Sequence, residues 1–130
     1  MKQKVQGIGG VFFKVKDPEK SKAWYKKHLG VDTNQYGAKF VLAEDETASE
    51  KTAITWSTMK DDTDYFAPSA KDVMINYRVS DLESFLIQLE EEGVTQVGEM
   101  QTYEYGKFAW ILDPDGYKVE LWVPMNEHIL

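Results

Sequence analysis

The sequence predicts an α+β fold in which two β-α-β-β-β modules form one curved mixed sheet with helices on its outer face. Two observations lead to this prediction. Strand-like runs and one helix-like run follow each other in the same order in both halves of the chain. The halves also share residues, because Asp81 repeats Asp17 at an offset of 64 (81 − 17) and Gly93 repeats Gly30 at an offset of 63 (93 − 30). Neither half can bury both faces of its sheet alone, so we expect the two to pair.

Length and composition favour one globular domain. The chain has 130 residues, of which 42% are hydrophobic and 13% aromatic. We expect a single domain over residues 1–130, with module one at about 7–60 and module two at about 73–124. The sequence contains no cysteine, which excludes disulfides, thiolate metal sites and cysteine nucleophiles.

Charge and hydropathy exclude two kinds of partner. A net charge of −7 lacks the basic footprint that binding to a phosphate backbone requires. No apolar run reaches the length of a membrane span, and the first residues lack the apolar core of a signal peptide. We therefore expect a cytoplasmic protein that binds neither nucleic acid nor membranes.

The first module is predicted to open with a strand over residues 8–16, in which apolar residues alternate. The pair Asp17-Pro18 is typical of a helix start, and the helix is predicted over residues 19–28, ending near Gly30. The helix residues expected in the core are Ala23, Trp24 and Leu29, and Trp24 and Tyr25 are expected to pack the helix on the outer face of the sheet. The rest of the module consists of strand-like pieces at residues 31–36, 38–43 and 52–59, with a polar loop at 44–51.

The second module follows residues 61–72, which lack periodicity and are interpreted as a connector. It is predicted to begin with a strand over residues 73–79. Ser80 and Glu83 then have the spacing of a capping box. An amphipathic helix ending at Gly93 is predicted by the i, i+3, i+4, i+7 spacing of Leu82, Phe85, Leu86 and Leu89.

The chain is predicted to end in a hairpin. A short strand at residues 95–99 and a loop at 101–106 precede it. Its two strands, residues 108–112 and 117–123, flank Asp113-Pro114-Asp115-Gly116, in which proline presets φ and glycine supplies the positive φ of a tight turn.

The second strand of this hairpin carries a carboxylate among aromatic positions. Its alternation places Lys118, Glu120 and Trp122 on one face of the sheet. The residues on the opposite face are Tyr117, Val119, Leu121 and Val123. A carboxylate in the middle of a strand requires a partner, and these residues alone leave a metal, a ligand or an ion pair open.

Two motifs resemble one known superfamily. They are Val-x-Asp-Pro-x-x-Ser-x-x-Trp-Tyr-x-x-x-Leu-Gly at residues 15–30 and Asp-Pro-Asp-Gly-Tyr-x-x-Glu at residues 113–120. With the two modules, they are similar to the glyoxalase, bleomycin-resistance and extradiol-dioxygenase superfamily, also called vicinal oxygen chelate. The resemblance covers residues 7–124 and implies the fold more specifically than any activity.

The resemblance implies metal ligands on the first and last strands of each module in metal-dependent members. The corresponding positions in this sequence are Gly10, Thr55, Met74 and Glu120. Glycine has no side chain, and hydroxyl and thioether groups are poor ligands for a divalent ion. Neither His28 nor His128 falls on such a position. We therefore expect no metal and no cofactor, with the alternative that Glu120 recruits Glu99 or Glu104 left open.

Glu120 is expected to face the concave side of the sheet together with aromatic walls and a few polar anchors, which suits an organic ligand. The other residues expected there are Phe12, Lys14, Thr55, Ser57, Met74, Asn76, Arg78, Trp110 and Trp122. Tyr103 and Tyr105 precede the hairpin and are expected to contact the ligand or a partner subunit. Arg78 and Lys14 contact the ligand or form an ion pair with Glu120, and the sequence favours neither reading.

The leading hypothesis is a metal-free protein, like the bleomycin-resistance branch, that binds a small molecule in an aromatic-lined cup and forms a homodimer. A second hypothesis is a metal-dependent lyase, isomerase or dioxygenase that uses Glu120. A version without metal makes Glu120 the general base and Arg78 the stabiliser of an oxyanion. A third hypothesis is an interaction module with a vestigial pocket. The identity of the ligand does not follow from the sequence.

Overall fold

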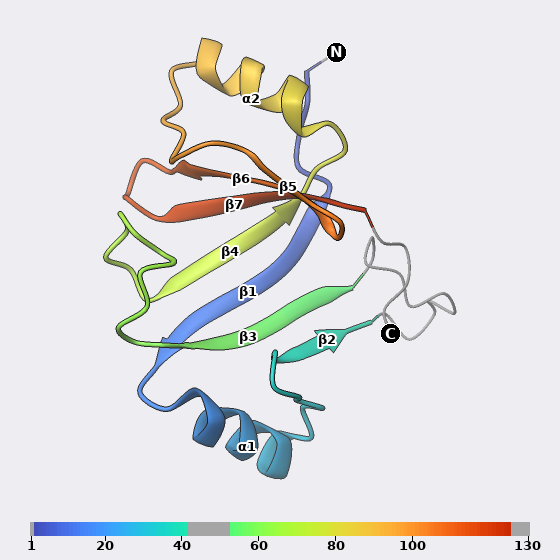
Figure 1. Ribbon diagram of the computed structural model, residues 1–130, viewed down its shortest axis with the longest axis vertical. Helices are drawn as coiled ribbons and strands as arrows, with labels where there is room; N and C mark the ends of the chain where they lie inside the picture. Colours follow the sequence, from blue (N-terminus) through green and yellow to red (C-terminus); the bar gives the residue numbers. More distant parts are fainter. Residues whose placement is uncertain (1, 42–52, 126–130) are drawn as a thin grey trace.

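The computed structural model describes residues 2–41 and 53–125, and this part of the chain forms a seven-stranded sheet with two helices (Figure 1). The elements in chain order are β1 (Gly7–Val15), α1 (Pro18–Leu29), β2 (Ala38–Phe40), β3 (Ile54–Lys60), β4 (Val73–Arg78), α2 (Leu82–Glu91), β5 (Gln101–Tyr103), β6 (Gly106–Leu112) and β7 (Lys118–Pro124). The predicted α+β class is confirmed, and module two has the predicted β-α-β-β-β order.

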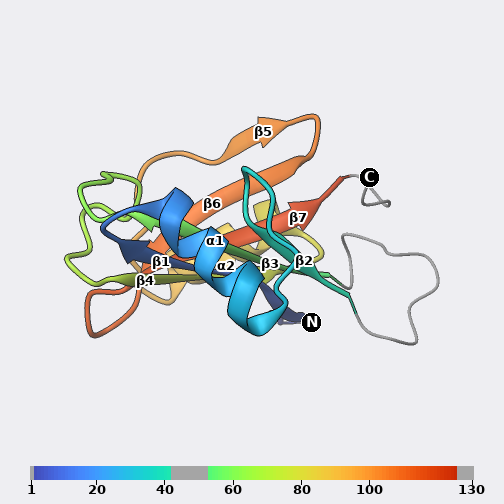
Figure 2. The same cartoon turned by 90° about the horizontal axis from the view of Figure 1, so that it is seen from below.

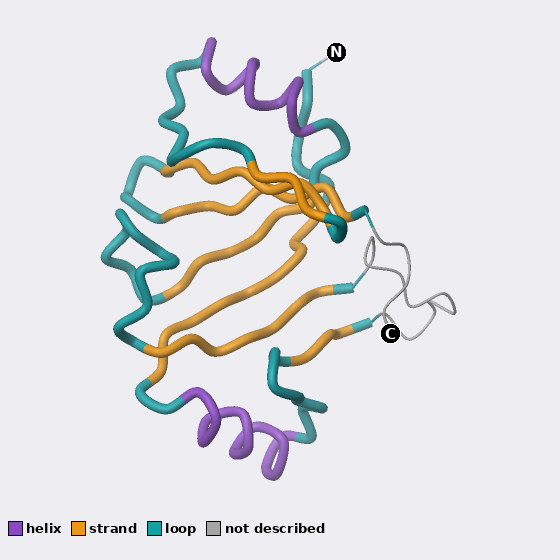
Figure 3. The backbone as a smooth tube through the Cα atoms, viewed as in Figure 1, coloured by secondary structure: helices purple, strands orange, loops and turns teal. Residues whose placement is uncertain are grey.

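The two modules meet at the centre of the sheet. The strand order is β2-β3-β1-β4-β7-β6-β5. At the junction β1 and β4 are antiparallel, and each also pairs in parallel with the last strand of its own module, β1 with β3 and β4 with β7. The sheet is therefore mixed, and α1 and α2 lie at its two ends (Figures 1 and 3). Figure 2 shows β5 and β6 turned out of the plane of β1, β3 and β4, so the sheet is curved and not closed.

Two predicted strands are absent from the described residues, and one strand was missed. Residues 31–36 contribute only an isolated bridge between Asn34 and Gly37, and residues 95–99 only a bridge between Gln96 and Ile111. Gly98 interrupts the second segment because its φ of +69° is left-handed. The chain then resumes pairing with β6 as β5, where a loop was predicted. The predicted pieces at residues 42–52 lie outside the described residues.

The helix boundaries follow from local capping. Asp17 accepts a hydrogen bond from the Lys20 amide at 3.1 Å, so the predicted start of α1 is confirmed. The predicted capping box at Ser80 is wrong, because Asp81 is the N-cap of α2 and accepts from the Ser84 amide at 3.1 Å. Neither helix in the described residues is long and apolar enough to span a membrane.

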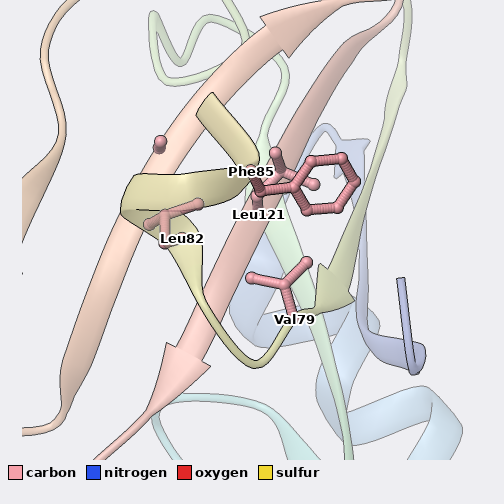
Figure 4. Close-up of a cluster of buried hydrophobic side chains, with 5 residues drawn as sticks. Val79, Leu82, Phe85 and Leu121 are labelled. Carbon is pink, nitrogen blue, oxygen red and sulfur yellow. The ribbon is translucent and has the colours of Figure 1, made fainter. Parts of the chain in front are cut away.

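The main core lies between α2 and the sheet (Figure 4). Its buried members are Val79, Leu82, Phe85, Ala109 and Leu121, with Leu86 and Leu89 packed against them. The apolar spacing of α2 thus correctly identified its buried face. Fully burying side chains of this size contributes about 1.5–3 kcal/mol each, so this cluster anchors module two and fixes the orientation of β7.

The predicted core contacts of α1 are wrong. Trp24 is 53% exposed, and Ala23 and Leu29 are exposed as well. The helix instead contacts the sheet through Tyr25, whose ring centroid lies 4.9 Å from that of Trp56 and 6.2 Å from that of Phe13. The predicted packing of Tyr25 on the outer face of the sheet is confirmed, and the predicted burial of Trp24 is wrong.

Candidate functional site: a buried carboxylate among aromatic rings

Five neighbouring strands place one residue each in a row across the sheet. In order from β3 to β6 these residues are Thr55, Gly10, Asn76, Glu120 and Trp110. Leu121, the next residue of β7, packs in the α2 core, so the Glu120 side chain points to the opposite face. We call this face, on the side away from the helices, the cup face.

The Glu120 carboxylate is 2% exposed, and both of its oxygens accept hydrogen bonds. The Trp110 indole donates to Oε1 at 3.1 Å, and the Tyr65 hydroxyl donates to the same oxygen in a short bond. The Asn76 amide donates to Oε2 at 2.9 Å. Three neutral donors therefore hold a carboxylate in an aromatic setting. Hydrogen bonds to an ionised acceptor are the strong ones, so the carboxylate is well fixed.

Tyr65 belongs to the candidate site and was missed by sequence reasoning. It lies in the segment 61–72 that was interpreted as a connector, and the neighbouring Phe66 is fully buried and anchors that segment. Burial, followed by the negative charge of Glu120, raises the pKa of the Tyr65 phenol well above its ordinary value. The phenol therefore stays protonated and donates to Glu120. The alternation of strand residues could not have indicated Tyr65, because the buried Phe66 that anchors it lies in a segment without periodicity.

Of the two alternatives left open for Arg78 and Lys14, the ion pair with Glu120 does not form among the described residues. Arg78 Nη1 donates instead to the Ala53 carbonyl at 2.8 Å, and burial lowers the pKa of its guanidinium. Lys14 Nζ lies 5.4 Å from the centroid of the Phe66 ring. Among the described residues, the ion pairs do not include Glu120.

Lys118 is the cation that lies over the aromatic rings next to Glu120. Its Nζ is 5.3 Å from the ring centroid of Tyr65 and 5.4 Å from that of Trp110. The same atom donates to the Tyr65 carbonyl at 2.7 Å. Burial lowers the pKa of the Lys118 ammonium, while the charges of Glu120 and Asp64 raise it. The ammonium thus lies over both rings, and Glu120 accepts from the polar atoms at their edges.

Aromatic side chains form a continuous wall beside the carboxylate. Phe108 stacks on Trp110 with centroids 6.5 Å apart and on Trp122 at 5.9 Å. The exposed rings of Tyr103 and Tyr105 stack on each other at 5.2 Å, and both lie against Phe108. Phe108 was absent from the predicted site, although it lies two residues before Trp110 in the same strand and therefore shares its face.

The strand register brings the other predicted site residues to the cup face. They are Phe12 and Lys14 on β1, Thr55 and Ser57 on β3, Met74, Asn76 and Arg78 on β4, Trp110 on β6, and Glu120 and Trp122 on β7. Ser57 is already engaged, because its hydroxyl donates to the Tyr36 carbonyl at 2.9 Å. Tyr103 lies at the end of β5 and Tyr105 in the following turn.

A bulge in β1 brings two glycines to the centre of the cup face. The β1–β4 register shifts between Ile8 and Gly10, so Gly9 is an extra residue in β1. A Cβ at Gly9 would lie 3.0 Å from Trp122 Cε3 and 3.1 Å from Arg78 Cγ, and it would overlap Asn76 Oδ1. Glycine at this position therefore lets Asn76 approach β1 while its amide donates to Glu120.

Replacing Gly9 with alanine is expected to lower the free energy of unfolding by about 1–3 kcal/mol, as overpacking of a tight site does. The physical reason is the overlap of the new Cβ with the Asn76 amide. Urea unfolding checks the prediction, with Thr102→Ala, at an exposed position of β5, as the control. Equal stability of the Gly9 variant and the wild-type protein would contradict the close approach.

The residues present do not fit a metal site of the type that the fold implies. The four positions carry Gly10, Thr55, Met74 and Glu120, and only the last offers a good ligand. Both Glu120 oxygens already accept hydrogen bonds. Among residues 2–41 and 53–125, no three His, Cys, Asp or Glu side chains are grouped so that they could hold a metal, and this includes Glu99 and Glu104. A metal ion at these positions would have Glu120 as its one good ligand.

In the repeat of the two modules, the residue of module one that corresponds to Glu120 is Ser57 and not Thr55. Glu120 lies beside Asn76 in the β4–β7 pair, and Ser57 lies beside Phe12 in the β1–β3 pair. The modules repeat at an offset of 64 residues, and β1 and β4 pair symmetrically about Val11 and Ile75. Phe12 of module one therefore corresponds to Asn76 of module two. A serine hydroxyl is no better a metal ligand than that of threonine, so the conclusion about the donor set is unchanged.

Solved structures of low sequence identity share this fold. The methylmalonyl-CoA epimerase of Mycobacterium tuberculosis is 21% identical with a TM-score of 0.63, and the match covers 92% of this chain and 89% of that chain. A variant of the Streptomyces coelicolor epimerase in complex with 2-nitronate-propionyl-CoA is 12% identical with a TM-score of 0.69, covering 93% and 99%. The Mn(II)-bound glyoxalase of Novosphingobium aromaticivorans is 18% identical with a TM-score of 0.60, covering 97% of this chain and 41% of that chain.

The sequence itself matches a family model over most of its length. None of the curated proteins compared with the sequence matches it. The model of the Glyoxalase/Bleomycin resistance protein/Dioxygenase superfamily matches residues 7–121, which run from β1 into β7 and include the row through Glu120. The chain belongs to the Glyoxalase/Bleomycin resistance protein/Dioxygenase superfamily.

Proposed function

We propose that this protein binds a small organic ligand, without a metal, on the cup face around Glu120. The observation that carries the proposal is the buried carboxylate, which three neutral donors hold beside a wall of aromatic rings. Removing a carboxylate from water is costly unless the charge is paired or strongly hydrogen-bonded. An apolar wall with a few fixed polar anchors is the typical lining of a site for small molecules.

Binding without a metal rests on the donor set. Gly10, Met74 and either Thr55 or Ser57 stand where the superfamily resemblance implies ligands, and a single carboxylate does not hold a catalytic ion. The same geometry weakens the version in which Glu120 and Arg78 catalyse a reaction together. Arg78 is bound to the Ala53 carbonyl, and no ion pair joins it to Glu120.

One observation favours a second candidate, an interaction module whose pocket is vestigial. The Tyr65 hydroxyl already donates a hydrogen bond to Glu120, so a side chain of the protein itself fills part of the site. The homodimer implied by the resemblance belongs to both candidates, because the stacked Tyr103 and Tyr105 rings are exposed and suit a second copy of the chain. A ligand that binds on the cup face separates the two candidates.

Replacing Trp110 with alanine is expected to weaken ligand binding by roughly tenfold or more, since contacts of an aromatic ring with a ligand and the lost anchoring of Glu120 together exceed about 1.4 kcal/mol. A panel of cationic, anionic and neutral aromatic compounds is first screened by tryptophan fluorescence. Calorimetry then measures each compound that binds. The matched control is Trp24→Ala, because Trp24 is exposed on α1, outside the cup face.

Unchanged affinity in the Trp24 variant with a loss in the Trp110 variant supports the cup face as the site. Equal affinity in both variants would place the ligand elsewhere. Failure of every compound to bind would leave the interaction module as the better description.

A further inference from the structure

We propose that the Tyr65 side chain occupies the place of the ligand, and that the ligand is a neutral phenol whose hydroxyl donates to Glu120 when Tyr65 swings out. The inference rests on the proposed function and adds the chemical class of the ligand. The Tyr65 phenol ring shows which shape and which hydrogen-bonding group fit next to Glu120.

Three contacts describe the place of the Tyr65 ring. Its hydroxyl donates to Glu120 Oε1. Its ring meets Trp110 edge to face, with centroids 6.3 Å apart and planes at 88°. The Lys118 ammonium lies 5.3 Å from the ring centroid. The place thus accepts a flat ring that carries one hydrogen-bond donor, with an aromatic neighbour and a cation over the ring.

Tyr65 differs from the other two donors in its freedom to leave. Asn76 lies on β4 and Trp110 on β6, inside the sheet, whereas Tyr65 lies in the segment 61–72 and is 37% exposed. The segment keeps its position without the Tyr65 side chain, because Phe66 is fully buried and Lys118 Nζ binds the Tyr65 carbonyl. A rotation of one side chain is therefore enough to open Glu120.

The charges around the ring select a neutral ligand. A cationic ring would lie against the Lys118 ammonium, which already covers both Tyr65 and Trp110. An anionic ring would lie against the negative Glu120 carboxylate and would offer it no hydrogen-bond donor. A purely apolar ring would leave Glu120 Oε1 with one donor fewer, and an underused buried acceptor is costly. A phenol satisfies all three neighbours.

Binding of p-cresol to the wild-type protein and to Tyr65→Ala tests the inference. Tyr65→Ala empties the place, so p-cresol is expected to bind this variant at least tenfold more tightly than the wild-type protein. Toluene lacks the hydroxyl, and benzylammonium carries a positive charge. Each is expected to bind at least tenfold more weakly than p-cresol. Calorimetry measures all three compounds under the same conditions.

Control variants show where the compound binds. Adding Glu120→Gln to Tyr65→Ala is expected to weaken p-cresol binding at least tenfold, because the acceptor loses its charge. Trp24→Ala, at an exposed residue of α1 outside the cup face, is expected to leave binding as in the wild-type protein. If Tyr65→Ala does not fold, Tyr65→Phe replaces it. Its ring lacks the hydroxyl that competes for Glu120, so p-cresol is still expected to bind this variant more tightly than the wild-type protein.

Equal binding of toluene and p-cresol, or binding unaffected by Glu120→Gln, would overturn the inference. Failure of p-cresol with binding of another panel compound that depends on Trp110 would overturn the phenol class and leave the proposed function standing. Failure of every compound in both the wild-type protein and Tyr65→Ala would overturn both.

Discussion

Replacing Glu120 with alanine is expected to lower the free energy of unfolding by about 2–4 kcal/mol, because each buried donor left without a partner costs about 1–3 kcal/mol. Asn76 is buried and loses its acceptor, and the Trp110 indole and the Tyr65 hydroxyl lose theirs. Removal of a buried charge offsets part of this loss. Urea unfolding of the variant and the wild-type protein measures the difference.

Glu120→Gln is the matched control for this prediction, with an expected loss under about 1 kcal/mol, since shape and hydrogen bonding are kept and only the charge is removed. The new carbonyl oxygen accepts from Tyr65 and Trp110. The new amide donates to Asn76 Oδ1, which has no partner in the structure, once the Asn76 amide turns over. A loss as large as that of the alanine variant would show that the charge itself, and not the hydrogen bonding, stabilises the site.

Alternation along strands correctly predicted which side chains share the cup face. The i, i+2 pattern of β7 separated Glu120 from Leu121, and the structure places the first among aromatic rings and the second in the α2 core. The spacing of α2 was equally informative, because its apolar residues recur with the period of a helix. Both predictions depend on regular backbone, for which sequence spacing gives side-chain direction.

What the sequence could not predict lies in segments without a period or in partners far along the chain. Tyr65 reaches Glu120 from 55 positions away, and nothing in the aperiodic segment indicates that its hydroxyl would point inward. Arg78 was expected beside Glu120 because both face the cup, but sharing a face does not decide which acceptor a long side chain selects. It selects the Ala53 carbonyl. On α1, exposed Trp24 shows that a large apolar side chain in a helix is no proof of burial.

Phe66→Ala is expected to lower the free energy of unfolding by about 3–5 kcal/mol, the typical loss for a fully buried phenylalanine. Phe66 is fully buried on the cup face, with Lys14 Nζ over its ring at 5.4 Å. The cavity left behind frees the segment 61–72 that carries Tyr65. We therefore expect Tyr65 to lose its fixed contact with Glu120, which a change in the tryptophan emission of the protein would report.

Leu82→Ala is the control that separates a general loss of stability from a specific effect on the site. Leu82 is also fully buried, but in the α2 core, and its expected loss of about 2–5 kcal/mol overlaps that of Phe66→Ala. Phe66→Ala is expected to change the affinity for any cup-face ligand by at least threefold, and Leu82→Ala to leave it unchanged while the protein stays folded. Equal effects of the two variants on affinity would mean that the change follows the general loss of stability and not the position of the segment 61–72.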